Sequence, residues 1–154
     1  MKLIIKIFIL YTITFFTLNN SYSENWFTSA GNYHSSKYSA LNQIDKNNVK
    51  KLKEVWIYEN GFKPLKEKNN YANNQATPIF TGKNLIVSSL DNSLIALNPE
   101  TGKERWRLKL DGYLLARRGF TYNEGNIFIP SSNGVYIVDE LTGKLNTELG
   151  NNGI

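Results

Sequence analysis

The sequence predicts an all-β fold, and an internal repeat and a pattern of short apolar runs lead to that prediction. Thr101-Gly102-Lys103 returns as Thr142-Gly143-Lys144, an offset of 41 (142 less 101), and the flanking residues align at that offset without a gap. Short runs of apolar or β-branched residues alternate with turn residues such as Asn, Gly and Pro. A period of about 40 residues made of short β runs is typical of β-propeller blades, each a four-stranded sheet.

Four short runs are the expected strands of the first blade. They are Ile79-Phe80, Leu85 to Val87, Leu94 to Leu97 and Trp106 to Leu110. Their spacing of about ten residues favours antiparallel hairpins over a β-α-β unit. The aligned stretches 125–129 and 135–139 predict strands of a second blade, with Glu124-Gly125-Asn126 as a hairpin turn. Only the leader and residues 47–52 are expected to be helical.

Two tryptophans occupy related places in this pattern. Trp106 follows the first Thr-Gly-Lys by three residues, and Trp56 ends an apolar run that begins at residue 48. A tryptophan at a recurring blade position can hold neighbouring blades together by stacking and burial, although each could equally be an ordinary core residue. Thr147 stands where the second repeat would carry its tryptophan, so this device is not strict.

Residues 1–23 are predicted to be a secretory signal peptide. Lys2 and Lys6 flank the start of a 12-residue apolar run, Ile7 to Leu18, and Ser21-x-Ser23 is a small-x-small cleavage pattern. As a helix that run would cover about 18 Å, which is short of the roughly 30 Å hydrocarbon core of a membrane. The expected result is cleavage before Glu24 and, in a bacterium, a periplasmic protein without a transmembrane anchor.

Composition excludes several classes of function. The chain has 154 residues, no cysteine, one histidine and a formal charge of +5, which falls to +3 without the leader lysines. The absence of cysteine excludes disulfides, thiolate catalysis and cysteine-based zinc sites. No dense basic patch is interleaved with aromatic residues, so nucleic-acid binding is not expected. The single histidine, His34, lies in a polar loop and supports neither a Ser/His/Asp triad nor a metal site.

An ordered series of motifs along residues 26–154 carries a family resemblance. The series runs Trp26, Gly31, 37–44 (KYSALNQI), Asn48-Val49 with Leu52 and Trp56, 75–79 (QATPI), 96–106 (ALNPETGKERW), 116–119 (ARRG), 142–144 (TGK) and 150–153 (GNNG). It resembles the pyrroloquinoline quinone (PQQ)-dependent dehydrogenases, and its tail is closer to the glucose-dehydrogenase-like branch than to the methanol branch. The resemblance implies an eight-bladed propeller that oxidises sugars or alcohols outside the cytoplasm.

The same resemblance limits what this chain can hold. Eight blades of this period need about 330 residues. Residues 24–154 are therefore expected to supply an N-terminal strand segment, one full blade and most of a second. In the family the Ca²⁺ ligands and the catalytic aspartate lie downstream of this region, so the isolated chain is expected to be inactive. Its expected partners are the remaining propeller blades or another chain, and the small-molecule substrate of the complete enzyme.

Two residues are candidates for contacts to PQQ, both by resemblance. Arg118, before Gly119, matches an arginine that donates hydrogen bonds to the quinone oxygens; a salt bridge is the alternative. Gln75 matches a position where many relatives have Glu in the cofactor pocket, and it would bind without adding charge; an ordinary polar residue at a strand start is the alternative. Arg117 is expected to lie next to the cofactor site without binding the cofactor. Leu114-Leu115-Ala116-Arg117 occupies the region of the vicinal cysteine pair of alcohol-oxidising relatives.

Three interpretations of the whole chain remain open at this point. It is the N-terminal part of a truncated or split quinoprotein dehydrogenase, a non-catalytic PQQ-repeat propeller module that assembles with another periplasmic chain, or a degenerate gene product. The sequence specifies neither the substrate nor the electron acceptor.

Overall fold

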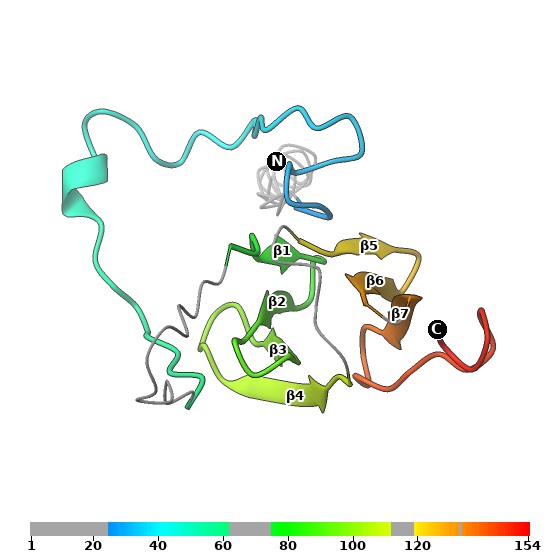
Figure 1. Cartoon of the computed structure of the whole chain (residues 1–154). Helices are drawn as coiled ribbons and strands as arrows, with labels where there is room; N and C mark the ends of the chain where they lie inside the picture. The colour runs from blue at the N-terminus through cyan, green and yellow to red at the C-terminus, as the bar shows by residue number, and fades with distance from the viewer. Residues whose placement is uncertain (1–24, 62–74, 112–118, 133) are drawn as a thin grey trace, which may run out of the picture.

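The computed structural model describes residues 25–61, 75–111, 119–132 and 134–154. These residues form two antiparallel β-sheets that lie side by side, preceded by a long N-terminal segment (Figure 1). Their one helical element is η1, a 3₁₀ turn at Val49–Lys51, inside the range expected to be helical. The all-β prediction is confirmed, whereas the predicted signal peptide lies outside the described residues.

The first sheet has the strand order β1-β2-β3-β4, as expected for a complete blade. Its strands are β1 (Ile79–Phe80), β2 (Leu85–Ser88), β3 (Ser93–Leu97) and β4 (Glu104–Lys109). All four predicted runs are strands: β1 has the predicted bounds, and the ends of the other three differ by at most two residues. The third strand is buried along its whole length, while β4 carries charged side chains and is largely exposed.

The second sheet has three strands in the order β5-β6-β7. They are β5 (Thr121–Asn123), β6 (Asn126–Ser131) and β7 (Gly134–Asp139). Beyond β7 the chain returns along its free edge: Leu145 forms an isolated bridge with Val138, and the Gly153 carbonyl accepts a hydrogen bond from Ile137 N–H at 2.8 Å. The second unit is thus most of a blade, as the repeat predicts.

Both repeats close the same turn with an Asx side chain. Asn98 Oδ1 accepts hydrogen bonds from the backbone N–H groups of Glu100 and Thr101. Asp139 Oδ1 accepts one from Thr142 N–H at 2.8 Å. In each turn the glycine N–H, from Gly102 or Gly143, donates to the carbonyl of the Asx residue at 2.9 Å. Both glycines have positive φ, +67° and +69°, which side chains rarely adopt. The Thr-Gly-Lys repeat therefore marks a repeated turn.

The hydrophobic core lies between the two sheets. Its buried members come from both sheets and from the chain that joins them: Ile79, Ile86, Leu94, Ala96, Leu110, Phe120, Ile127, Ile129, Tyr136 and Val138. At one side of this core the Tyr136 hydroxyl donates to the Asp111 carbonyl at 2.7 Å, which ties β7 to the end of β4. Face-to-face burial of this kind fixes the position of the second sheet on the first.

The N-terminal segment first joins the two sheets and then leaves them. Trp26 and Phe80 exchange two backbone hydrogen bonds of 2.9 Å, and the Phe27 carbonyl accepts Tyr122 N–H at 2.9 Å. The segment then loops away past η1 and returns to the first sheet near residue 56 (Figure 1). Within the described part of the chain, no helix is long and apolar enough to cross a membrane.

Candidate functional site

The strand registers give each sheet two distinct ends. At one end of the first sheet lie the residues before β1, the β2–β3 turn and the residues after β4, because Ser93 pairs with Lys109 and Ile79 with Ile86. We call this the Asp91 end, after the residue in the β2–β3 turn. At the opposite end lie the β1–β2 turn and the Thr-Gly-Lys turn. The second sheet has the same orientation, because β5 and β7 run in the corresponding directions.

Of the two predicted cofactor residues, only Gln75 is among the described residues, on the side of β1 that faces the Asp91 end. Gln75 is exposed and precedes β1 by four residues, at the end of the strand that faces the β2–β3 turn. Arg118 lies outside the described residues, as do Arg117 and Leu114 to Ala116. The described residues on either side of that gap are Asp111 and Gly119. The structure thus brings no described partner to Gln75 from the predicted site.

Asp91 is a titratable group at this end, and its contacts hold the β2–β3 turn. Its carboxylate accepts the Ser89 hydroxyl, the Ser93 hydroxyl at 3.1 Å and the Ser93 N–H at 3.3 Å, and Lys109 Nζ lies 3.4 Å from it. Partial burial raises the pKa of Asp91, but the hydrogen bonds from Ser89 and Ser93 and the Lys109 charge outweigh it and lower this pKa. A carboxylate so stabilised is a weak base, so Asp91 is suited to shaping the turn and not to accepting a proton from a substrate.

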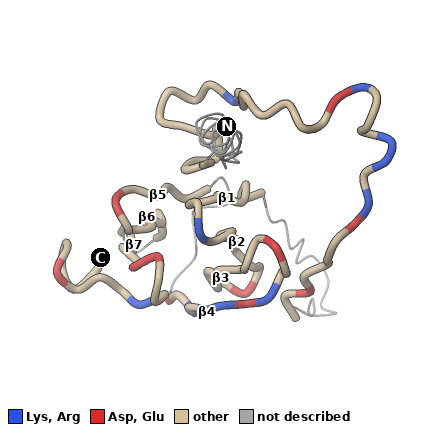
Figure 2. The backbone as a smooth tube through the Cα atoms, turned by 180° about the vertical axis from the view of Figure 1, so that it is seen from behind, with Lys and Arg blue, Asp and Glu red and all other residues tan. Residues whose placement is uncertain are grey.

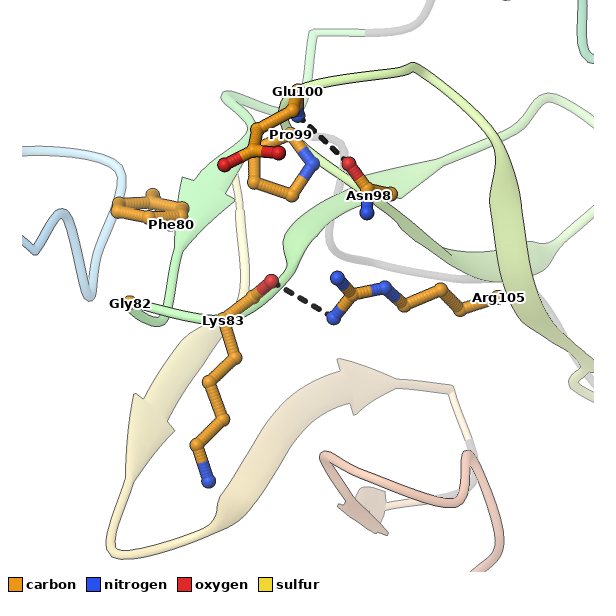
Figure 3. A pocket seen from close by; sticks show the side chains of 7 residues that line it. All are labelled: Phe80, Gly82, Lys83, Asn98, Pro99, Glu100 and Arg105. Atoms are coloured by element: carbon orange, nitrogen blue, oxygen red, sulfur yellow. Dashed lines mark hydrogen bonds between the residues drawn. The ribbon is translucent and has the colours of Figure 1, made fainter.

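The opposite end of the first sheet holds an open pocket of about 510 Å³. Figure 3 shows Phe80, Asn98, Glu100, Lys83 and Arg105 around it, with Arg105 Nη1 donating to the Lys83 carbonyl at 3.0 Å. Because this pocket lies at the Thr-Gly-Lys end, it does not include the predicted cofactor residue Gln75. The same guanidinium nitrogen also donates to Asn84 Oδ1 at 2.7 Å, so it is committed to structural contacts.

Each tryptophan of the repeat docks on the following Thr-Gly-Lys turn. Trp56 Nε1 donates to the Pro99 carbonyl at 3.1 Å, and a Cβ added to Gly102 would lie 2.5 Å from the indole. Trp106 Nε1 donates to the Glu140 carbonyl at 2.9 Å, and a Cβ on Gly143 would also lie 2.5 Å from its ring. Pro99 and Glu140 are separated by the repeat offset of 41 residues, and so are Gly102 and Gly143. The predicted contact of tryptophan between neighbouring blades is confirmed at Trp106, while Trp56 makes the same contact from a segment outside the two described sheets.

A buried carboxylate lies between the two sheets. Glu140 is 2% exposed, and its Oε1 accepts Thr81 Oγ1–H and Asn84 Nδ2–H, both at 2.6 Å. The acceptor is on the Thr-Gly-Lys turn of the second sheet and the donors are in the β1–β2 turn of the first. Burial of an unpartnered carboxylate would be costly, and these donors remove that cost. Glu140 therefore joins the two turns as a structural residue.

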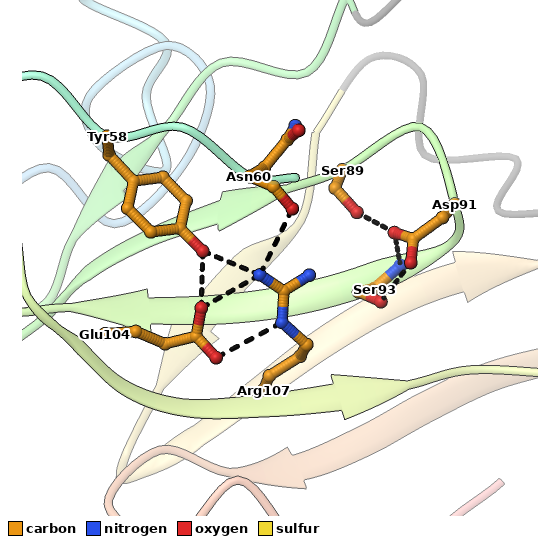
Figure 4. Close-up of polar contacts among 7 residues, drawn as sticks. All are labelled: Tyr58, Asn60, Ser89, Asp91, Ser93, Glu104 and Arg107. Atoms are coloured by element: carbon orange, nitrogen blue, oxygen red, sulfur yellow. Dashed lines mark hydrogen bonds and ion pairs between the residues drawn. The ribbon is translucent and has the colours of Figure 1, made fainter. Parts of the chain in front are cut away.

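The returning N-terminal segment is held by a second polar cluster (Figure 4). The Tyr58 hydroxyl donates to Glu104 and accepts from Arg107 at 2.7 Å, while Arg107 and Glu104 form an ion pair at 2.8 Å. Burial and the Glu104 carboxylate raise the pKa of Tyr58 to about 12, and hydrogen bonds from Arg107 lower the pKa of Glu104. All three groups stay in their ordinary charge states near neutrality, so the cluster fixes the segment and offers no proton donor or acceptor.

The charge distribution does not single out a second site among the described residues. Acidic and basic residues both occur along the N-terminal segment and along β4 (Figure 2). In the parts of the chain that the structure describes, no group of three or more His, Asp or Glu side chains could hold a metal ion.

A family model for the β-propeller domain of glucose, ethanol and alcohol PQQ dehydrogenases matches residues 26–154. The chain belongs to the PQQ β-propeller family. The first complete sheet and the incomplete second sheet are therefore blades of that propeller. The prediction of this family is confirmed. The prediction that the chain holds only an N-terminal part of the propeller is also confirmed.

Curated relatives of this PQQ-family chain are much longer than it is. It is 33% identical over 146 residues to quinoprotein glucose dehydrogenase A of Acinetobacter calcoaceticus. This alignment covers 76% of the chain and 18% of that relative. It is 34% identical over 104 residues to the glycerol dehydrogenase large subunit of Gluconobacter thailandicus. This alignment covers 64% of the chain and 14% of that relative. The chain thus spans less than a fifth of the length of these relatives.

Solved structures support the same fold. A europium-containing methanol dehydrogenase superposes with a TM-score of 0.63 at 24% identity, covering 79% of the chain and 22% of that protein. The quinohemoprotein alcohol dehydrogenase from Comamonas testosteroni gives a TM-score of 0.61, also at 24% identity. At this identity the likeness concerns the propeller fold alone.

Sequence reasoning missed the two polar clusters. Glu140 occupies the repeat position of Pro99, and nothing in its neighbourhood distinguishes it from an exposed turn residue. Tyr58, Glu104 and Arg107 come together from segments 46 residues apart or more, so no local motif connects them. A spacing of three places Glu104 and Arg107 on opposite faces of a regular strand, so it gave no signal of their ion pair.

Proposed function

We propose that this chain is the N-terminal part of a periplasmic quinoprotein dehydrogenase that oxidises a sugar or an alcohol with PQQ. The observation that carries the proposal is the family match over residues 26–154, which coincides with one complete blade and most of a second. Relatives named as glucose and glycerol dehydrogenases support this substrate class. The predicted leader, residues 1–23, supports export of the chain before the propeller assembles.

The Asp91 end offers suitable chemistry for PQQ. Gln75 is exposed there, and its carboxamide can both donate to and accept from a quinone carbonyl or a carboxylate. We assign Arg118 to the same pocket, where a planar guanidinium would donate to the quinone oxygens and stabilise developing negative charge. PQQ, when bound, supplies the acceptor for the hydride that leaves the substrate carbon. Ca²⁺ ligands and the catalytic aspartate are assigned to the remainder of the propeller.

Asp91 and Lys109 are excluded from proton transfer in this proposal. Their charges face each other at 3.4 Å, and the aspartate is also hydrogen-bonded by two serines. Their role would be to keep the β2–β3 turn rigid beside the pocket. Precise support of this kind matters because a displaced positioning group weakens catalysis steeply.

The proposal is tested with the coding sequence that adjoins this one. Further Thr-Gly-Lys-x-x-Trp repeats with an aspartate and Ca²⁺ ligands are expected, and an unrelated gene there would contradict the split-enzyme function and favour a binding module. The isolated chain, titrated with PQQ and Ca²⁺, is expected to show no dye-linked dehydrogenase activity. Turnover by the isolated chain would contradict the assignment of the catalytic aspartate elsewhere.

Arg118 is tested in the completed enzyme. Arg118→Ala should weaken PQQ binding and reduce turnover by about 100-fold, the scale seen when one donor to a developing oxyanion is removed. Arg117→Ala is the matched control, since it removes the same charge from the neighbouring residue and should leave turnover nearly unchanged. Equal effects of the two variants would remove the role assigned to Arg118.

A further inference from the structure

The chain contains three Asn-Gly pairs, and two of them lie wholly among the described residues. They are Asn60-Gly61, where the N-terminal segment returns to the first sheet, and Asn152-Gly153, which follows β7. The third, Asn133-Gly134, includes a residue outside the described part. An asparagine before glycine is chemically labile, because the next backbone nitrogen can attack the side-chain amide carbon and glycine has no side chain to obstruct it.

The structure protects the Asn152-Gly153 pair against this reaction. Gly153 is buried; its N–H donates to the Leu149 carbonyl at 2.9 Å, and its own carbonyl accepts Ile137 N–H at 2.8 Å. A Cβ on Gly153 would lie 3.0 Å from the Leu145 Cβ, so packing also restrains this peptide. The nitrogen must therefore lose a hydrogen bond and move before it can reach the Asn152 side chain.

The Asn60-Gly61 pair has neither restraint within the described residues. Gly61 is exposed, and its N–H makes no hydrogen bond to another described residue. Apart from its neighbours in the chain, no described atom lies within 4 Å of the place of a Cβ on Gly61. The Asn60 side-chain amide points away from Tyr58 and Arg107 (Figure 4). The Gly61 nitrogen can therefore turn toward that amide without meeting a described neighbour.

We propose that Asn60 is a site of spontaneous deamidation, which converts it to aspartate and isoaspartate. The Gly61 backbone nitrogen attacks Asn60 Cγ, and the new N–Cγ bond closes a succinimide ring. The Cγ–Nδ2 bond breaks, and ammonia leaves with the proton of the Gly61 amide. Water from the solvent then opens the ring at Cγ to give aspartate, or at the backbone carbonyl carbon to give isoaspartate. The reaction needs neither PQQ nor an enzyme, so the proposal does not depend on the dehydrogenase function.

The modification changes the polar cluster of Tyr58, Glu104 and Arg107. Arg107 Nη2 donates to the Asn60 backbone carbonyl at 3.5 Å and to Glu104 at 2.8 Å. In the isoaspartyl product that carbonyl carbon becomes a free carboxylate, and the main chain runs through the former side-chain carbon. A new negative charge then lies beside Arg107, where it competes with Glu104, and the longer main chain displaces the preceding residues.

The experiment incubates the full chain in near-neutral buffer and follows the Asn-Gly pairs by peptide mass spectrometry. Asn60 should deamidate about tenfold faster than Asn152, because only the second site must first break a hydrogen bond to its buried glycine. Isoaspartate at position 60 is detected by methylation with a purified isoaspartyl methyltransferase. In concentrated urea the two rates should agree within about twofold, because unfolding removes the contacts of Gly153.

Two variants serve as matched controls. Asn60→Gln lengthens the side chain by a methylene group, which disfavours ring closure, and should remove the modification there without changing the rate at Asn152. Asn152→Gln should leave the rate at Asn60 unchanged. The deamidated chain can be separated by its lower positive charge. Its residues 56–60 should exchange amide hydrogens about threefold faster than those of the unmodified chain, through loss of the Arg107 contact.

Several results would overturn the proposal. These are equal rates at Asn60 and Asn152 in the folded chain, an intact Asn60 after the unfolded chain has been modified, and an isoaspartate signal that persists in the Asn60→Gln variant. A difference in rate that persists in urea would also overturn it, since local sequence and not the fold would then set the rates. Identical exchange in modified and unmodified chains would contradict the effect on Arg107.

Discussion

The two tryptophan junctions use the same contact but differ in what surrounds it. At the Trp106 junction a complete sheet packs on a second sheet, with an apolar core and the buried Glu140 between them. At the Trp56 junction a single segment lies on the first sheet, held by the exposed Arg107 and the half-buried Tyr58. The comparison teaches that the tryptophan sets the geometry, while buried area and buried hydrogen bonds set the strength.

The largest expected effect is at the glycine under Trp106. Gly143→Ala should lower the free energy of unfolding by about 3 kcal/mol, because the new Cβ meets the packed indole at 2.5 Å and φ is positive. Gly102→Ala should cost only about 1 kcal/mol, since the Trp56 segment can move away. Urea denaturation measures both. Gly125→Ala is the control, with φ of +82° and nothing within 4 Å. Equal losses at positions 102 and 143 would show that the two junctions are equally rigid.

The next effect concerns the buried carboxylate. Glu140→Ala should destabilise the chain by about 2 kcal/mol, because it leaves the donors of Thr81 and Asn84 buried without an acceptor. Glu140→Gln keeps an acceptor oxygen and should cost less. Thermal unfolding would rank the two variants against Glu100→Ala, a change in an exposed turn that is expected to be neutral. If Glu140→Ala matched that control, the buried bonds would contribute nothing to the second junction.

A smaller effect is expected in the polar cluster at the Trp56 junction. Glu104→Gln should lower stability by about 0.5 kcal/mol, since its ion pair with Arg107 is roughly one-third exposed and screened by solvent. Hydrogen exchange of residues 56–60 should rise while exchange in β6 stays unchanged. Exchange that rises equally in both regions would mean that this cluster supports the whole core and not the segment alone.

The smallest effect expected at neutral pH concerns the difference in charge between the two Asx turns, which carry the neutral Asn98 and the ionised Asp139. Hydrogen bonds from Thr142 lower the pKa of Asp139, so its stabilising effect is present above the ordinary aspartate pKa and is lost as pH falls through the lowered value. Asp139→Asn should change stability by less than about 0.5 kcal/mol at pH 7, because Asn98 makes the same turn in the first repeat. It should also flatten the loss of stability below about pH 4. Unfolding curves at pH 7 and pH 3 test this, and an unaltered acid response would contradict it.

Much of the fold could be predicted from local patterns. The turn at Thr101-Gly102 repeats because the Asx residue accepts hydrogen bonds from the Thr and Gly backbone N–H groups within five residues, and such contacts leave a visible motif. The strands could also be predicted, because they coincide with apolar runs that are visible in the local sequence. The partners of Glu140 could not be predicted, since its burial depends on how the second sheet packs on the β1–β2 turn of the first.

The candidate site shows the same division. Gln75 was selected through a resemblance, and in the structure it precedes β1, whose first residue lies at the Asp91 end, opposite the Thr-Gly-Lys turns. The pattern at Trp56 predicted a contact between neighbouring units. Its contacts with Gly102 and Pro99, and the outward exposure of Val55 and Ile57, followed only from the placement of the segment on the sheet.

The sequence by itself determined the repeat, the all-β class and the family, because these depend on the order and spacing of residues along the chain. The tertiary structure decided which ends of the strands meet, how deeply Glu140 is buried and which side chains of residues 55–58 remain exposed. The physical reason is that turns are closed by near neighbours. Burial and junction strength, by contrast, arise from contacts between residues far apart in the chain, and no local pattern records those contacts.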